Sequence, residues 1–282
     1  MSAKADRSDE ARKDEAQDDA ASVKKSDPAL PRAKEIHDLV LEEGEDEIER
    51  GFGSLAWSGL AAGLSMGFSF LVMSIMRGAL PDRPWAILID GTGYTVGFLI
   101  AVLGRQQLFT ESTLTAVLPV LSRSSHGTIA KLLRLWVIVL AANLIGTIIF
   151  AWLISHEGLF KPQTWTALNE ISTESLQSSF WPMLIKSVLS GWLIALMVWM
   201  LPGAGPAQVL IIMILTYVVA IGQFSHMVAG SVEAAFAVLT GHASALDYVF
   251  KFAVPTLIGN TIGGVSLVAI LNHAPLRSDE EV

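Results

Sequence analysis

The chain has 282 residues, of which 52% are hydrophobic and 16% are charged, and it contains no cysteine. This composition is too apolar for an ordinary soluble domain, and the absence of cysteine excludes disulfides and thiolate metal sites. Residues 1–50 hold 9 of the 19 Lys and Arg residues and 16 of the 27 Asp and Glu residues, so the net charge of −8 belongs mostly to this segment. Because no basic stripe occurs, we expect no nucleic-acid partner. The composition indicates a membrane protein with a charged N-terminal tail.

The N-terminal tail divides into two parts. Residues 1–32 contain almost no large apolar side chains, so they cannot bury enough surface to offset the entropy of folding, and we expect disorder. Over residues 33–50, Ile36, Leu39, Val40 and Ile48 recur among many acidic residues, which indicates a helix with a narrow apolar stripe. A solvated charged linker would fit this segment equally well. We expect a cytoplasmic tail over 1–50, a transmembrane domain over 51–272 and a short tail over 273–282.

The first half of the transmembrane domain contains three apolar segments. A span is expected over 52–76, where Ala62, Gly63 and Gly67 permit close helix approach. A second apolar run over 85–103 breaks at residues 104–107, and apolar sequence then continues from Leu108 only to about residue 121. That second piece is too short to span, so residues 85–121 are interpreted as one crossing interrupted at depth by irregular backbone. A third span is expected over 132–155.

The second half follows the same plan. A polar loop is expected over 156–179, followed by spans over 180–201 and 248–271 that flank a second broken helix, interrupted at residues 222–226. The third spans of the two halves also resemble each other, with Asn143 and Gly146 matched by Asn260 and Gly263. Three spans per half require opposite insertion, as in inverted-repeat channels and transporters. We therefore predict an all-α membrane protein with six transmembrane helices, two of them broken, although two helices rich in small residues can also be alike by chance.

The second break places polar residues inside an apolar segment: Gly222, Ser225 and His226. Unpaired polar groups in hydrocarbon are costly, so these residues should face a protein interior or a water-filled path. An ionisable residue at membrane depth is a candidate functional residue, while a histidine buried for packing alone is the alternative. Glu233 lies seven residues later, on a similar face of a continuous helix, and we expect it to form a structural pair or a subunit interface.

Three separated motifs carry a family resemblance. They are Gly104-x-x-x-Leu108-Phe109-Thr110, Phe224-x-His226 and Pro255-x-x-x-Gly259-Asn260-x-x-Gly263-Gly264. Over about residues 51–271 the chain resembles the formate/nitrite transporter family, and its long charged tail resembles the YfdC-like branch. The resemblance implies an aquaporin-like inverted repeat in the inner membrane, without a cofactor. It also implies a homopentamer with one pore per subunit, through which small monovalent anions such as formate or nitrite pass.

The resemblance also implies roles for residues. In that family the histidine lies between two apolar constrictions and faces the Leu-Phe-Thr break, which implies His226 and Thr110 as the pore and proton-exchange residues. An anion crosses a dry apolar ring only at high cost, and a histidine, whose unperturbed pKa is near ~6.5, can hold a proton while the anion is beside it. The remaining candidates are Leu108, Phe109 and Phe224 as constrictions, with ordinary packing as the alternative, Gly104, Gly222 and Ser225 in the break loops, and Asn143, Gly146, Asn260 and Gly263 in helix packing.

The chain also departs from the family pattern. Ser225 stands where many members have Glu, Gly230 where they have Asn, and Gly191 where several have Asn, which leaves the substrate open. Two other functions remain: a channel for small neutral solutes, and a non-conducting membrane scaffold that uses the charged tail. No nucleotide motif or nucleophile–base arrangement indicates an enzyme. A slight excess of positive charge in the short loops on the side of the tail predicts that both termini are cytoplasmic.

Overall fold

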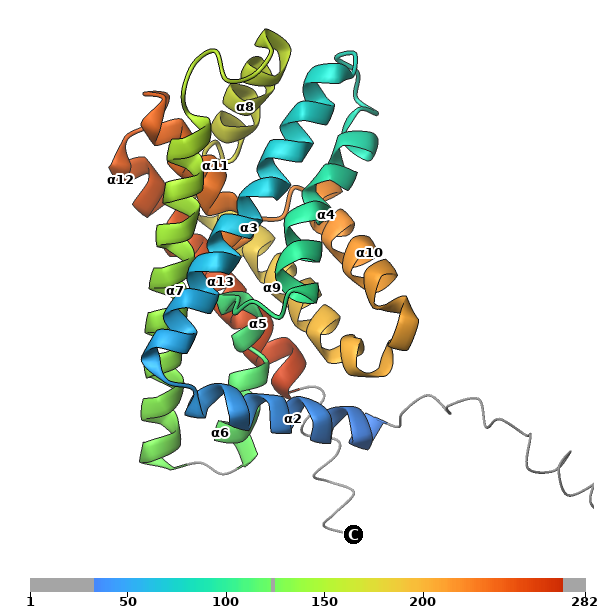
Figure 1. Cartoon of the computed structure of the whole chain (residues 1–282), viewed down its shortest axis with the longest axis vertical. Coiled ribbons are helices and arrows are strands. Elements are labelled where there is room, and N and C mark those ends of the chain that lie inside the picture. Colours follow the sequence, from blue (N-terminus) through green and yellow to red (C-terminus); the bar gives the residue numbers. More distant parts are fainter. Residues whose placement is uncertain (1–32, 123–124, 271–282) are drawn as a thin grey trace, which may run out of the picture. The chain divides into compact units, whose positions relative to one another are not determined.

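The computed structural model describes residues 33–122 and 125–270, and side chains within 34–122 and 125–266. The expected disorder of residues 1–32 and the expected tail at 273–282 fall outside the described residues. In the described part of the chain every regular element is helical (Figure 1). The first half contains α2 (Ala33–Glu49), α3 (Phe52–Ala79), α4 (Ile87–Leu103), α5 (Phe109–Ser112), the short 3₁₀ helix η1 (Thr115–Val117), α6 (Leu118–Ser122) and α7 (His126–Ile154).

The second half contains α8 (Pro162–Glu174), α9 (Phe180–Met200), the 3₁₀ turns η2 (Leu201–Gly203) and η3 (Gly205–Ala207), α10 (Gln208–Ile221), α11 (Met227–Leu239), α12 (Ala245–Asp247), α13 (Val254–Ile262) and two π-helical segments, η4 (Tyr248–Ala253) and η5 (Gly263–Ile270). Helix α8 corrects the loop expected over 156–179. It begins with Pro162, which suits a first helical position, and buries Ala167, Leu168 and Ile171 against its neighbours α3 and α11. This apolar stripe is too short to indicate a helix among so many polar residues.

The two halves use the same helix pairs. Helix α3 packs against α4 and α7, and α9 packs against α10 and α13. Glycines make the closest contacts in both halves. A Cβ on Gly146 would lie 2.6 Å from the carbonyl oxygen of Leu60, and a Cβ on Gly191 would lie 2.5 Å from that of Asn260. Because backbone meets backbone there, the helices approach closely only where a side chain is missing.

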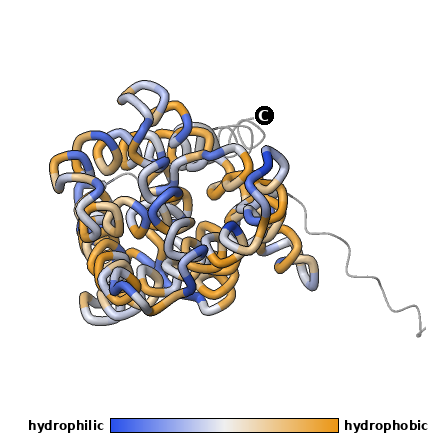
Figure 2. Tube along the Cα trace, turned by 90° about the horizontal axis from the view of Figure 1, so that it is seen from above, coloured by the Kyte–Doolittle hydropathy of each residue, from blue (hydrophilic) through white to orange (hydrophobic). Residues whose placement is uncertain are grey.

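The surface of the described part is that of a membrane protein. Three of its helical segments are long and apolar enough to cross a bilayer: Phe52–Ala79, His126–Ile154 and Phe180–Gly203. Seen from above, hydrophobic residues occur all round the helical body (Figure 2). Many of them are exposed, including Trp57 at 74%, Val137 at 68% and Trp181 at 70%. Large exposed apolar surfaces require lipid or another subunit to cover them. The last expected span, 248–271, falls on η4, α13 and η5 in succession.

Helix α2 packs against η1, α6, α7 and α9 at the end of the body opposite α8 (Figure 1). Its apolar stripe is covered, since Val40 is fully buried and Ile48 is 5% exposed. Gly44 lies directly against the carbonyl oxygen of Thr115, so a side chain there would overlap it. Arg134 donates hydrogen bonds to the carbonyl oxygens of Ile48 (3.1 Å) and Arg50 (2.7 Å) just beyond the stripe. These contacts fix α2 beside the first break.

Candidate functional site

Both breaks have the same backbone course. Helices α4 and α10 end at Leu103 and Ile221 and are capped by Gly104 and Gly222. The next residues, Arg105 and Gln223, have φ angles of 50° and 49°. The chain then becomes extended and starts a new helix after Leu108 in the first break and after His226 in the second. The left-handed conformation is unfavourable for residues other than glycine, so the surroundings must hold it in place.

Two asparagines hold these breaks with matching hydrogen bonds. Asn143 Oδ1 accepts from the N–H of Phe109 (2.9 Å), and its Nδ2 donates to the carbonyl oxygens of Gln107 (3.0 Å) and Gly59 (2.8 Å). In the second half, Asn260 Oδ1 accepts from the N–H of Met227 (2.7 Å), and its Nδ2 donates to the carbonyl oxygens of Ser225 (3.0 Å) and Ser187 (2.7 Å). Both side chains are fully buried. The predicted packing residues are therefore also hydrogen-bonding clamps.

The clamps bring the two breaks together at His226 and Thr110. Their Nε2 and Oγ1 atoms lie 2.8 Å apart, and both residues are 1% exposed. The N–H of Ala229 donates to His226 Nδ1 (3.1 Å) and caps α11, so Nδ1 is an acceptor. In the neutral ring the proton is therefore on Nε2, which donates to Thr110, and the Thr110 hydroxyl hydrogen remains available for another acceptor. The site thus contains a neutral imidazole and a free hydroxyl donor.

Aromatic and aliphatic side chains lie around the two breaks. The three residues expected to form constrictions occupy different places there. Leu108 is fully buried at the start of α5. Phe109 packs edge-on against Trp136 of α7, with ring centroids 5.8 Å apart. Phe224 is half-buried and lines the same cavity as His226. Phe98 on α4, which no sequence pattern singled out, is fully buried and packs edge-on against the His226 ring, with centroids 5.0 Å apart.

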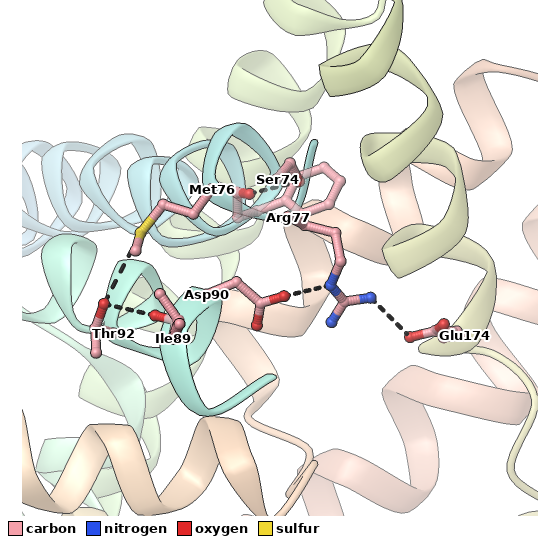
Figure 3. A network of polar contacts seen from close by, with 8 residues as sticks. Ser74, Met76, Arg77, Ile89, Asp90, Thr92 and Glu174 are labelled. Atoms are coloured by element: carbon pink, nitrogen blue, oxygen red, sulfur yellow. Dashed lines mark hydrogen bonds and ion pairs between the residues drawn. The ribbon is translucent and has the colours of Figure 1, made fainter. Parts of the chain in front are cut away.

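One cavity of about 390 Å³ extends from His226 toward α8, and we call it the α8-side vestibule. Its charged and titratable lining residues include Arg77, Glu174, Lys186, His226 and Glu233. Arg77 forms ion pairs with the buried Asp90 and, at 3.8 Å, with Glu174 (Figure 3). Glu233 lacks the structural pair expected for it, because within the described part of the chain no hydrogen bond or ion pair reaches its carboxylate. The neighbouring arginine is already engaged by two other acids.

A second cavity of about 670 Å³ lies between α2 and the first break, and we call it the α2-side vestibule. Its lining contains five carboxylates and two arginines: Glu42, Glu43, Asp46, Glu47, Glu111, Arg50 and Arg105. Arg50 donates to Gln107 Oε1 (2.6 Å), and Arg105 pairs with Glu43 at 3.3 Å. Burial raises the pKa of Glu47 to about 7, against the opposing effect of a 2.6 Å hydrogen bond from Thr115. This vestibule is more negative than the α8-side vestibule.

At the positions that depart from the family pattern, neighbouring groups lie close to the smaller residue of this chain. A Cβ on Gly230 would lie 2.7 Å from the Phe252 ring, and one on Gly191 would meet the Asn260 backbone. Ser225 points toward Met183, with Oγ 2.9 Å from Sδ. In this chain a larger residue at position 191 or 230 would displace its neighbour. Across the described residues, no group of three or more His, Cys, Asp or Glu side chains is arranged to hold a metal ion.

The chain is similar to known proteins over most of its length. A family model described as "Formate/nitrite transporter" matches residues 34–274. The inner membrane protein YfdC of Escherichia coli (strain K12) is 42% identical over 248 residues, which cover 88% of this chain and 80% of that protein. The formate channel BtFdhC of Bacillus thuringiensis is 27% identical over 254 residues, covering 87% of this chain and 96% of that protein.

Solved structures have the same fold. A pentameric formate channel with formate bound superposes with a TM-score of 0.68 at 20% identity and covers 83% of this chain and 98% of its own. An ion channel described as belonging to the FNT family gives a TM-score of 0.70 at 20% identity, covering 83% of this chain and 94% of its own. The predicted all-helical membrane fold is therefore confirmed.

Proposed function

Because this chain belongs to the formate/nitrite transporter family, we propose that it moves a small monovalent anion or its conjugate weak acid across the membrane, with His226 exchanging a proton with the substrate. The observation that carries this proposal is the buried 2.8 Å contact between Thr110 and His226, which joins the two breaks. A substrate at this point can accept from the Thr110 hydroxyl and, in place of Thr110, from the Nε2–H of His226, inside an apolar surround that includes Phe98. Small carboxylates and nitrite have the acceptor oxygens that these donors suit.

The apolar surround determines the form in which the substrate crosses. Moving an isolated anion past Leu108, Phe98 and Phe224 is far more costly than moving a neutral acid. An anion beside the imidazole favours a second ring proton, which Nδ1 accepts when it releases the N–H of Ala229. The imidazolium then passes a proton to the anion, and the neutral acid crosses. The excess of carboxylates in the α2-side vestibule repels anions and also favours the neutral acid there.

Replacing the pore histidine tests the proposal. In liposomes containing His226→Asn, acceleration of formate uptake by an inward proton gradient is expected to be abolished, because Asn keeps polarity but does not titrate. His242→Asn, which changes an exposed histidine in a loop, is the matched control and should behave as wild type. Uptake should be scaled to assembled protein. Unchanged gradient-driven uptake in well-assembled His226→Asn would refute proton exchange at this residue.

The same assay separates the alternative functions. Formate or nitrite uptake that is independent of the proton gradient, together with flux of small uncharged solutes, would favour a channel for neutral solutes. No flux across a panel of small weak acids would favour a membrane scaffold. We propose that the protein works as a homopentamer in the inner membrane with both termini cytoplasmic. The α2-side vestibule is then on the cytoplasmic side and the α8-side vestibule on the outer side.

A further inference from the structure

Glu233 is a titratable group in the α8-side vestibule, and the proposed proton exchange at His226 does not use it. It lies on α11, seven residues after His226, so the two residues are on a similar face and separated by about 10 Å along the helix axis. Both line the same cavity of about 390 Å³. Its carboxylate has no hydrogen bond or ion pair among the described residues, although unpaired carboxylates inside proteins are rare. A group in this position is free to gain and lose a proton.

The hydrogen bonds of His226 create a need for such a group. Nδ1 accepts from the N–H of Ala229 at the positive end of α11, so the resting ring is neutral and carries a single proton on Nε2. Each exchange with an anion therefore requires a second proton to reach the ring. Water in the vestibule can carry it from a titratable group on the same cavity wall.

We propose that Glu233 is that donor: it takes a proton from the solution in the α8-side vestibule and delivers it through vestibule water to His226. This inference rests on the proposed function. The Glu233 carboxylic acid gives up its proton and becomes a carboxylate, while the imidazole becomes an imidazolium. The imidazolium transfers a proton to an oxygen of the substrate anion and returns to the neutral imidazole, and the neutral acid moves on. The carboxylate then regains a proton from solution, so one proton enters with each substrate.

The groups facing Glu233 are compatible with this cycle. Tyr94 from α4 and Glu174 from α8 are its electrostatic neighbours, and neither is a cation that would hold Glu233 as a carboxylate. Arg77 from α3 is held by Asp90 and Glu174, as Figure 3 shows, so it does not fix Glu233 as a carboxylate. Two further groups are near. Lys186 from α9 lines the same cavity without a partner among the described residues, and Tyr248 donates to or accepts from Ser231 rather than Glu233.

The test compares three variants in liposomes, with labelled formate as the probe. Glu233→Gln is expected to lower proton-driven uptake about tenfold or more and to flatten its pH dependence, because the amide cannot carry a proton. Glu233→Asp, which still titrates, should retain most of the uptake. Glu174→Gln is the comparison variant: it removes the same charge from the same vestibule but leaves the Glu233 carboxyl, so its uptake should still depend on pH, with at most a shifted midpoint.

A second measurement separates the relay from the exchange step. At equal pH on both sides, exchange of labelled for unlabelled formate needs no net proton, so Glu233→Gln should retain it while His226→Asn loses it. If Glu233 acts only as a repelling charge, Glu233→Gln would instead raise uptake at every pH, which would overturn the relay. If gradient-driven uptake in Glu233→Gln equals that of wild type, the relay is overturned but the proposed function is not. Absence of formate transport in wild type would overturn the proposed function and the relay together.

Discussion

At the scale of single residues, Asn143 and Asn260 determine the geometry on which the site depends. Each asparagine bonds two backbone groups that a helix break leaves without helical partners, together with one carbonyl oxygen of a neighbouring helix. Buried backbone groups need such partners, because water is absent there. The Asn260 clamp places His226 at the start of α11, and the Asn143 clamp places Thr110 in α5. The contact between the two breaks is therefore a consequence of residues that touch no substrate.

This dependence predicts the effect of removing a clamp. Asn260→Leu keeps similar volume but leaves the N–H of Met227 and two carbonyl oxygens without their partner, which should cost about 2 kcal/mol or more. The expected drop in the unfolding midpoint of the solubilised protein is about 4 °C or more. Asn169→Leu is the control, since its side chain donates only to Trp165 in its own helix. Equal midpoints for the two variants would show that the clamp contributes little.

At the scale of elements, α2 is a charged helix docked beside a charged cavity. Its carboxyl group at Glu47 contacts Thr115 and Gln107 and faces Glu43, Arg50 and Glu111. Burial raises the pKa of Glu47 from 4.5 to about 7 in the docked helix. The docked state therefore keeps a proton that the undocked state loses as the pH rises from 4.5 to 7. Docking of α2 is thus most stable at low pH, and it weakens as the pH rises through this window.

Amide hydrogen exchange checks this pH dependence. After correction for intrinsic rates, amides of Ala33–Glu49 should exchange about tenfold or more slowly at pH 5 than at pH 8, since one pKa unit corresponds to a tenfold change in equilibrium. Glu47→Gln should remove most of the difference and leave α2 protected at both pH values. An equally large pH effect in Glu47→Gln would assign it to another titratable group at the docking contact, on α2 or on the body that it packs against.

At the scale of the whole molecule, the exposed apolar surface sets the requirement for partners. Side chains such as Trp57, Trp181 and Phe250, which is 63% exposed, are stable only against lipid or another subunit. Gly146 and Gly191 in the long helices are already used inside the subunit, where they meet backbone. We therefore expect contacts between subunits to use the large exposed side chains, which cover area well.

We expect the protein to purify as a pentamer held by this apolar surface, as the formate channel of the same fold is described as pentameric. Native mass spectrometry in mild detergent and in nanodiscs should give a main species of five subunits. Replacing an exposed apolar residue that lies in a subunit contact by Arg should shift the distribution toward smaller species. Mainly monomers in both environments would count against the pentamer.

The sequence alone determined the helical membrane class, the two breaks and the equivalent positions of Asn143 and Asn260 in the two halves. These features follow from apolar length, interrupted runs and repeated small residues, which are local patterns that the bilayer selects strongly. The sequence also selected His226 and Thr110 as candidates, from a polar cluster and a family motif. It did not indicate α8, whose short apolar stripe is visible only once α3 and α11 are placed against it.

Only the tertiary structure decided which groups meet. The Thr110–His226 contact joins residues 116 positions apart, and the place of Phe98 beside the ring depends on how α4 packs. The sequence suggested a structural pair or a subunit interface for Glu233; the structure shows no pair among the described residues and leaves the side chain lining a vestibule, because Arg77 already binds Asp90 and Glu174. Competition between partners for one charge depends on distances across helices. Such distances are properties of the folded packing, so no local pattern of residues encodes them.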